Sequence, residues 1–304
     1  MIRARSLQAQ ELFPSVPRER LVFFSCGHIV PPHHLRLLLV ARRARARAEE
    51  GARWGVGERH ALFGLRERAS RAHRSGPTNK QFDFTHKSRG THEQIDELGR
   101  LLVNTCTLTP EGVVCFLPSF DYECAVMDRW AASGTLAQLS KRKRVFREPR
   151  AAREVDAVLR DYSAASCAGA IIFCVVGAKM SEGLNFADGL ARSVVVVGLP
   201  YPDKTDVELQ QKLRFLGQRA GTEHYQNLCM CAVNQSIGRA IRHAKDYAAV
   251  LLVDQRYTRD ASVQEKLPKW MAPSTAAPSH FGELVRDMRA FFARHQGGDE
   301  PRSE

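Results

Sequence analysis

The sequence predicts an α/β protein whose strands form a doubly wound, mainly parallel sheet with helices on both faces. Such sheets need buried strands that alternate with helices. Segments with helical spacing of apolar residues do lie between short runs that are almost wholly apolar, the pattern of parallel strands buried on both faces. The runs are LVFFSC (21–26), GVVCFL (112–117), AIIFCVV (170–176), SVVVVGL (193–199) and AAVLLVD (248–254).

Helices are expected where apolar residues recur every three or four positions within polar segments. Segments of this kind separate the apolar runs, and one further segment follows the last run. They are THEQIDELGRLLVNTC (91–106), YECAVMDRWAA (122–132), AAREVDAVLRDYS (151–163), DVELQQKLRFLG (206–217), NQSIGRAIRHAKDY (234–247) and FGELVRDMRAFFARH (281–295).

The charge of the chain is unevenly distributed. The 304 residues carry a net charge of +12, which favours an anionic partner, with nucleic acid as the first candidate. Residues 41–74 hold ten Arg and four Glu and so supply +6 of this total. Their composition departs from the flanking sequence, and three interpretations stay open: a solvated insertion, a basic arm for DNA, or translated non-coding sequence.

These compositional changes predict the domain organisation. Residues 1–40 and 75–295 are expected to form one α/β domain, interrupted by an Arg-rich, disordered insertion at 41–74. Residues 296–304 are expected to be a disordered tail. The eight cysteines form no CxxC pair and mostly lie in apolar runs, which favours reduced, buried thiols in an intracellular protein over a metal site. No apolar run is long enough to span a membrane.

Polar residues follow two of the predicted strands at the edge where parallel sheets bind ligands. GAKMSEGLNFAD (177–188) follows one strand, and its glycines, Lys179 and Ser181 suit a phosphate group. Ser119 and Phe120 follow another strand and offer a hydroxyl group and a ring that can stack on a base. An ordinary strand-to-helix loop and a core aromatic residue are the alternatives.

The segment 234–247 is predicted to be a helix with one polar face. Val233 and Ile237 lie on its apolar stripe, whereas Gln235, Arg239 and Arg242 fall on the opposite side. Two guanidinium groups and an amide together suit phosphate oxygens, although two ordinary solvated arginines are the simpler interpretation. The dipeptide Gly-Lys occurs nowhere in the sequence, so a GxxxxGK[ST] phosphate loop is missing.

These motifs together resemble one helicase family. GVVCFLPSF, GAKMSEGLNFAD, VVVVGLPYP, NQSIGRAIRH and VLLVDQRY, in this order, resemble the second RecA-like motor domain of superfamily 2 DNA helicases of the XPD/FANCJ iron–sulfur group. FSCGHIVPP and SGP point to its cohesion-associated, ChlR-type branch. The resemblance covers about residues 6–40 and 75–295, and it implies a RecA-like fold.

The resemblance also implies roles for individual residues. Arg239 and Arg242 match arginine fingers that reach a nucleotide bound by the first motor domain. Nucleotide-binding positions are matched by Gln235, Gly183, Asn185 and Asp188, although the group often has Asp at the position of Asn185. DNA-binding positions are matched by Ser119, Lys179 and Ser181, and Phe120 is a further DNA-binding candidate because its ring can stack on a base.

As a whole, the resemblance implies the C-terminal motor domain of an ATP-dependent 5′–3′ DNA helicase located in the nucleus. ATP with Mg²⁺ would bind in a site shared with an N-terminal helicase half, and a 4Fe–4S cluster is expected only in that half. DNA and cohesion or repair proteins are the implied partners. Without the phosphate loop and DEAH box, the chain alone is expected to be inactive. A non-catalytic RecA-like module that binds nucleic acid or a protein partner is the alternative.

Overall fold

The computed structural model describes residues 62–64, 76–180, 186–239, 246–268, 275–276 and 281–296, all of which belong to the unit Glu58–Glu304. The predicted strand at 21–26, residues 1–40 and the tail 297–304 lie outside these residues. Within the range expected to be an insertion, the structure describes Leu62–Gly64, which form a strand.

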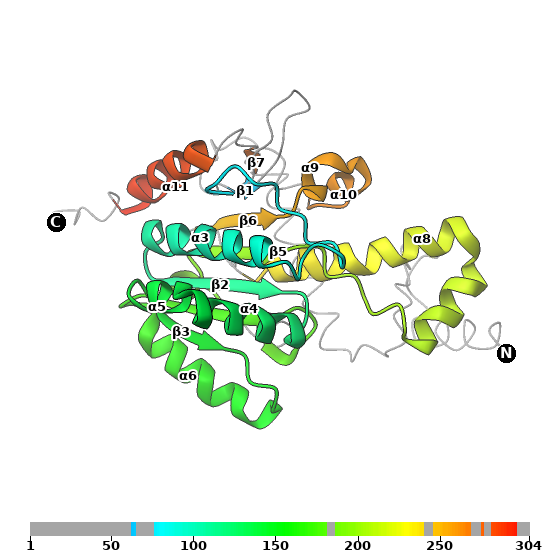
Figure 1. Cartoon of the computed structure of the whole chain (residues 1–304), viewed down its shortest axis with the longest axis horizontal. Helices are drawn as coiled ribbons and strands as arrows, with labels where there is room; N and C mark the ends of the chain where they lie inside the picture. The colour runs from blue at the N-terminus through cyan, green and yellow to red at the C-terminus, as the bar shows by residue number, and fades with distance from the viewer. Residues whose placement is uncertain are drawn as a thin grey trace, which may run out of the picture. The chain divides into compact units, whose positions relative to one another are not determined.

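A parallel sheet forms the centre of this unit (Figure 1). In the described residues its strand order is β3-β4-β2-β5-β6-β1-β7, and every neighbouring pair is parallel. The predicted α/β class with a mainly parallel sheet is therefore confirmed. The strands are β1 (Leu62–Gly64), β2 (Gly112–Leu117), β3 (Arg144–Arg147), β4 (Ala170–Val175), β5 (Ser193–Val197), β6 (Ala249–Val253) and β7 (Thr275–Ala276).

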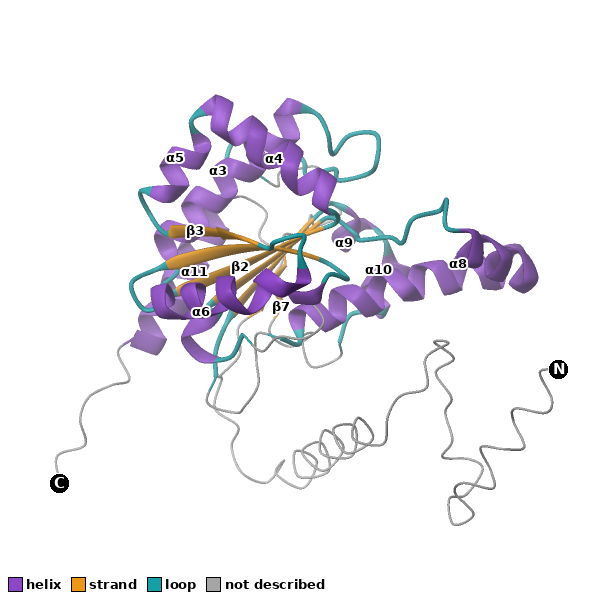
Figure 2. Ribbon diagram, turned by 90° about the horizontal axis from the view of Figure 1, so that it is seen from below, coloured by secondary structure: helices purple, strands orange, loops and turns teal. Residues whose placement is uncertain are grey.

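Helices cover both faces of the sheet. Figure 2 shows α3, α4 and α5 on one side and α6 and α8 on the other. The helices are α3 (His92–Leu108), α4 (Phe120–Ser133), α5 (Thr135–Ser140), α6 (Val155–Ser166), α8 (Val207–Ile237), α9 (Arg256–Arg259), α10 (Ala261–Glu265) and α11 (Phe281–Gln296), with 3-10 turns at η3 (Ala152–Glu154) and η4 (Asp188–Leu190). In the described part of the chain, no helix has the length and apolar character that a membrane span requires.

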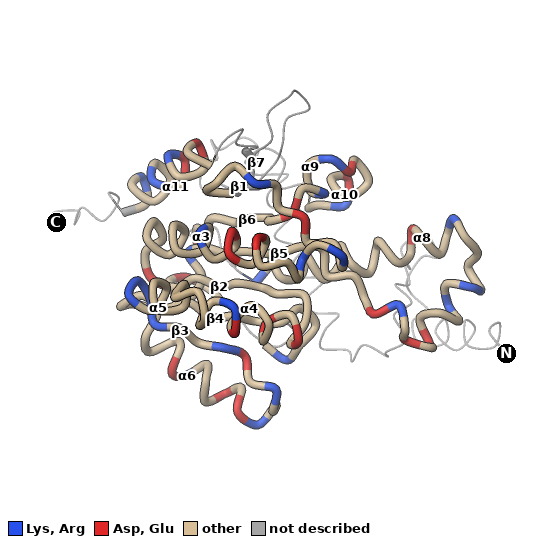
Figure 3. Tube along the Cα trace, viewed as in Figure 1, with Lys and Arg blue, Asp and Glu red and all other residues tan. Residues whose placement is uncertain are grey.

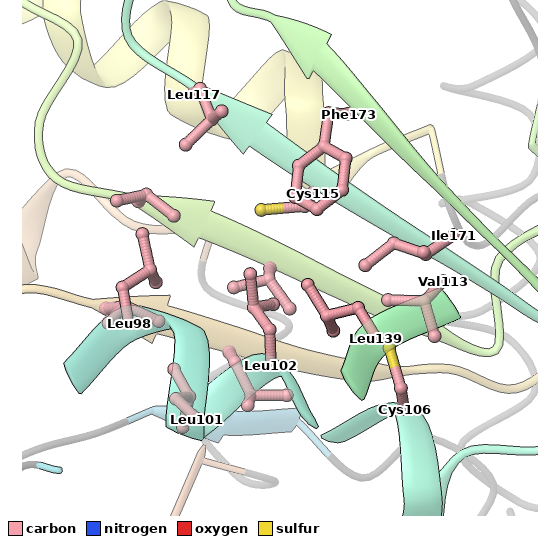
Figure 4. Close-up of a cluster of buried hydrophobic side chains, with 14 of the residues drawn as sticks. Leu98, Leu101, Leu102, Cys106, Val113, Cys115, Leu117, Leu139, Ile171 and Phe173 are labelled. Carbon is pink, nitrogen blue, oxygen red and sulfur yellow. The ribbon is translucent and has the colours of Figure 1, made fainter. Parts of the chain in front are cut away.

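Alternating side chains of the central strands build two hydrophobic layers. Val113, Cys115 and Leu117 of β2 join the cluster beneath α3, which Figure 4 shows in close-up. Val114 and Phe116 join the cluster on the other face, beneath α6 and α8. Successive residues of a strand point to opposite faces, so β2 contributes to both layers and reads as a continuous apolar run.

The predicted helix at 234–247 is wrong in one respect. Helix α8 ends at Ile237, and Gly238 is its C-cap, with its N–H donated to the carbonyl of Asn234 at 2.9 Å. Glycine at a helix end has little of the cost that it has inside a helix, so Gly238 needs no functional compensation. Arg239 lies just beyond the helix, and residues 240–245 lie outside the described part of the chain.

Candidate functional site at two edges of the sheet

The loops that follow β2 and β4 lie side by side at the carboxyl edge of the sheet. These strands are neighbours in register, with Leu117 opposite Val175, and the N–H of Val176 donates to the carbonyl of Leu117 at 3.0 Å. The segments that carry Ser119 and Lys179 begin directly after them. The structure therefore brings together two of the loops that the sequence assigned to this edge.

Ser119 caps the helix that follows β2. Its Oγ accepts a hydrogen bond from the N–H of Tyr122 at 3.2 Å, and this cap begins α4. A hydroxyl group that accepts one bond still has its own proton to donate. Phe120 is half-buried, and the guanidinium group of Arg150 lies 5.2 Å from its ring centroid. Arg150 is held there by Asp121, at 2.9 Å.

A buried carboxylate holds the start of the loop after β4. One carboxyl oxygen of Glu148 accepts the N–H of Val175 at 2.8 Å, and the other accepts the N–H of Met180 at 2.7 Å. The exposed Lys179, between these two residues, donates to the carbonyl of Ala152 at 3.0 Å. Burial raises the pKa of Glu148, because desolvation outweighs the two N–H donors that lower it. Sequence analysis missed Glu148, since it follows the unpredicted strand β3.

This carboxylate predicts a pH dependence of stability. A raised pKa means that the folded chain binds the Glu148 proton more tightly than the unfolded chain does. We therefore expect the free energy of unfolding of the wild-type chain, relative to Glu148→Gln, to fall as the pH rises from 4.5, the ordinary value, towards neutrality. Urea titrations of both proteins across this range measure the difference. A difference that grows with pH would mean that the two N–H donors dominate.

The opposite, amino edge of the sheet carries an ionic network. Glu111, Arg192 and Asp246 lie just before β2, β5 and β6, respectively. Nε of Arg192 donates to Glu111 at 2.9 Å, and its terminal nitrogen donates to Asp246 at 3.2 Å. The side chain of Asp246 is 0% exposed and that of Arg192 is 12% exposed. Since a buried charge is stable only when paired, these groups depend on each other.

The network also reaches the candidate nucleotide residue Asp188. The N–H of Asp188 donates to the second carboxyl oxygen of Asp246 at 3.3 Å. The guanidinium group of Arg192 lies 4.0 Å from the ring centroid of Tyr247, and that ring stacks on His295 of α11. Asp246, which lies just before β6, therefore holds Asp188, the last residue of the segment 177–188. No motif marks Arg192 or Asp246 in the sequence, because their partnership exists only after folding.

The candidate residues at the end of α8 shortly precede Asp246 of this network in the sequence. Gln235 is exposed and Arg239 is half-buried, with its N–H donated to the carbonyl of Ser236 at 3.4 Å. The next described residue along the chain is Asp246. Gln235 also borders an open pocket of about 490 Å³ beside α10, whose other lining residues are Asn227, Met230, Cys231, Asn234 and Lys266.

The remaining candidate residues, Ser181, Gly183, Asn185 and Arg242, lie outside the described residues. A metal-binding group of three or more His, Cys, Asp or Glu side chains is not found in the part that the structure describes. Asp96 pairs with Arg129 at 2.6 Å, which also lowers its pKa, and Glu97 is buried against Thr78 and Arg100. Asp96 and Glu97 therefore serve the packing of α3.

Comparison with known proteins gives a consistent family assignment. A family model described as the helicase C-terminal domain matches residues 102–274. The ATP-dependent DNA helicase DDX11 of Danio rerio is 38% identical over 294 residues, which cover 91% of this chain and 29% of that protein. The ATP-dependent DNA helicase CHL1 of Meyerozyma guilliermondii is 37% identical over 297 residues, which cover 93% and 32%, respectively.

A solved structure of an XPD helicase matches with a TM-score of 0.49 and 19% identity, over 72% of this chain and 35% of that one. The chain spans about three tenths of the length of its DDX11 and CHL1 relatives. The matched family model covers more than half of the 304 residues and includes β2, β4, β5, β6 and the whole of α8. The chain therefore belongs to the helicase C-terminal domain family, as found in the DDX11 and CHL1 DNA helicases.

Proposed function

We propose that the chain is the C-terminal motor domain of an ATP-dependent 5′–3′ DNA helicase that works together with an N-terminal motor domain. The observation that carries this proposal is the distribution of candidate residues over two edges of one parallel sheet. Ser119, Phe120 and Lys179 belong to the carboxyl edge, whereas Asp188 meets Asp246 at the amino edge. Two separate surfaces suit a domain that contacts DNA and a nucleotide at the same time.

The nucleotide surface consists of Gln235, Arg239 and Arg242 together with Gly183, Asn185 and Asp188. Guanidinium groups bind phosphate oxygens in pairs and neutralise charge that develops during phosphoryl transfer. Hydrolysis of ATP with Mg²⁺ supplies the free energy for unwinding. The sequence lacks a GxxxxGK[ST] loop, so the phosphates and the metal ion would be held by the other motor domain, and this chain would provide arginine fingers.

The proposed DNA surface consists of Ser119, Phe120 and Lys179, together with Ser181, which lies outside the described residues. Hydroxyl and ammonium groups position the phosphate backbone without reading its sequence. The buried Glu148 supports this surface, because it fixes the backbone on both sides of Lys179. We place the enzyme in the nucleus with DNA as its partner, because the DDX11 and CHL1 relatives are DNA helicases. Cohesion or repair proteins are the further partners that the sequence resemblance implies. The described cysteines do not gather into an iron–sulfur site.

The division of labour between the two motor domains is directly testable. We expect the purified chain to hydrolyse no ATP, with or without DNA, because phosphoryl transfer requires the phosphates and Mg²⁺ to be held as well as charge to be neutralised. Joined to an N-terminal motor domain that carries the phosphate loop, it should show DNA-stimulated hydrolysis. A steady-state phosphate-release assay measures both rates.

Two results would contradict this proposal. DNA-stimulated turnover by the chain alone would show that it holds the phosphates itself. No gain in turnover over the N-terminal motor domain alone would instead favour the non-catalytic module that binds nucleic acid or a protein partner. A variant lacking the phosphate-loop lysine of the N-terminal domain controls for contaminating activity.

A further inference from the structure

Helix α8 contains an elbow, residues 209–222, that extends beyond the rest of the described unit in both Figure 1 and Figure 2. The helix follows β5 through the loop 198–206, so it begins at the carboxyl edge of the sheet. In Figure 1 the strand arrows point towards the elbow. It therefore lies on the same side of the sheet as the loops that carry Ser119 and Lys179.

The elbow has a defined shape that two glycines make possible. Gly217 has φ 76° and ψ 175°, a conformation open essentially to glycine alone. Gly221 is buried against the turn before it, where an added Cβ would come within 2.9 Å of the carbonyl oxygen of Leu213. The second half of α8 is in turn anchored to the loop after β5, because the hydroxyl of Tyr225 donates to the carbonyl of Pro202 at 2.7 Å.

This shape leaves an aromatic ring in solvent. Phe215 is 83% exposed, and Leu216 beside it is 37% exposed. The third large hydrophobic side chain that is exposed in the described residues is Val207, and it too lies in the first half of α8. Single exposed apolar residues are ordinary, but this group is confined to one short stretch of one helix. A ring this exposed has its face open for stacking.

Basic residues are concentrated near Phe215 in the sequence, although Glu208 and Glu223 directly flank the elbow. Residues 209–222 contain Lys212, Arg214 and Arg219 and no acidic residue. Figure 3 shows Lys and Arg positions along the outer turn of α8, together with acidic positions elsewhere on the helix. Both arginines are exposed, and in the described part of the chain neither forms an ion pair. An exposed ring with two exposed arginines close to it in the sequence suits a base and its neighbouring phosphates, because stacking accepts any base and arginines neutralise the backbone.

We propose that the α8 elbow is a binding site for single-stranded nucleic acid, in which one base stacks on Phe215 and neighbouring phosphates contact Arg214 and Arg219. A strand bound there would pass the carboxyl edge of the sheet. The identity of that strand as DNA rests on the proposed function, whereas the site itself rests on the exposed ring and the charges.

The test measures binding of a fluorescent oligothymidylate to the purified chain by anisotropy at one low salt concentration. Phe215→Ala should weaken binding by about five- to one-hundredfold, the usual effect of losing one stacked base. Phe215→Trp should bind at least as well as the wild type, and its tryptophan fluorescence should be quenched by the strand. Val207→Ala, another exposed apolar position of α8, should leave the affinity unchanged.

A second arm tests the charges. The double variant Arg214→Gln, Arg219→Gln should lower the slope of log affinity against log salt by about 1.4, since each phosphate contact contributes about 0.7 for single strands. Arg160→Gln, an exposed arginine of α6, is the matched control and should not change the slope.

The outcomes separate this proposal from the proposed function. Equal affinity of Phe215→Ala and the wild type overturns the elbow site while the carboxyl-edge DNA surface stands. Absence of any binding by the wild-type chain overturns both. If Phe215→Ala instead changes the mass of the chain in light scattering and leaves DNA affinity intact, then the elbow is a protein interface and the proposal is wrong.

Discussion

In an enzyme that carries both motor domains, Arg242→Ala is expected to lower kcat for ATP hydrolysis by roughly 10³-fold, about 4 kcal/mol, and to abolish unwinding. An arginine finger stabilises the transition state more than the bound nucleotide, so kcat should fall more than KM rises. Steady-state hydrolysis and a strand-displacement assay measure the two effects. Binding of DNA, measured by anisotropy, should remain nearly intact.

Two further variants give this prediction its controls. Arg242→Lys should not restore turnover, because an ammonium group lacks the planar fork that contacts two oxygens at once. Arg160→Ala removes an exposed arginine from α6, far from either candidate surface in sequence, and should leave kcat unchanged. Near-normal kcat in a folded Arg242→Ala enzyme would show that Arg242 is an ordinary solvated arginine and not an arginine finger.

Asp246→Ala is expected to lower the free energy of unfolding by about 3 kcal/mol. The change removes the fully buried partner of Arg192 and the acceptor for the N–H groups of Asp188 and Tyr247. For a domain of this size the melting temperature should fall by roughly 6–12 °C. Urea denaturation and thermal unfolding of the purified chain measure both quantities.

A double-mutant cycle assigns this loss to the network. The change Arg192→Ala should cost much less in the Asp246→Ala background than in the wild type, because contacting charges are coupled. Glu93→Ala breaks the exposed pair between Lys80 and Glu93, whose side chains are 47% and 74% exposed, and should cost less than about 1 kcal/mol. Additive effects of Arg192→Ala and Asp246→Ala would contradict the interpretation of the amino edge as one unit.

Much of the fold followed from the sequence, because the buried strands are defined by their own composition. β2, β4, β5 and β6 coincide with predicted apolar runs to within two residues at either end. Strand β3 was missed because its residues, RVFR, are exposed or half-buried at the edge of the sheet, so no apolar run marks it. The family was evident from the order of five motifs, which the comparisons confirmed.

The sequence by itself determined the α/β class, the family and the residue types available for phosphate and DNA, since each depends on local composition or on a motif read along the chain. Only the tertiary structure decided that α8 ends at Ile237, that Glu148 fixes the loop around Lys179, and that Arg192 binds Asp246. The last two facts depend on groups that are distant in the chain and meet only when parallel strands bring their ends together. Burial makes these contacts important for stability, because a charged side chain removed from water needs a partner of opposite charge or a hydrogen-bond donor within the fold.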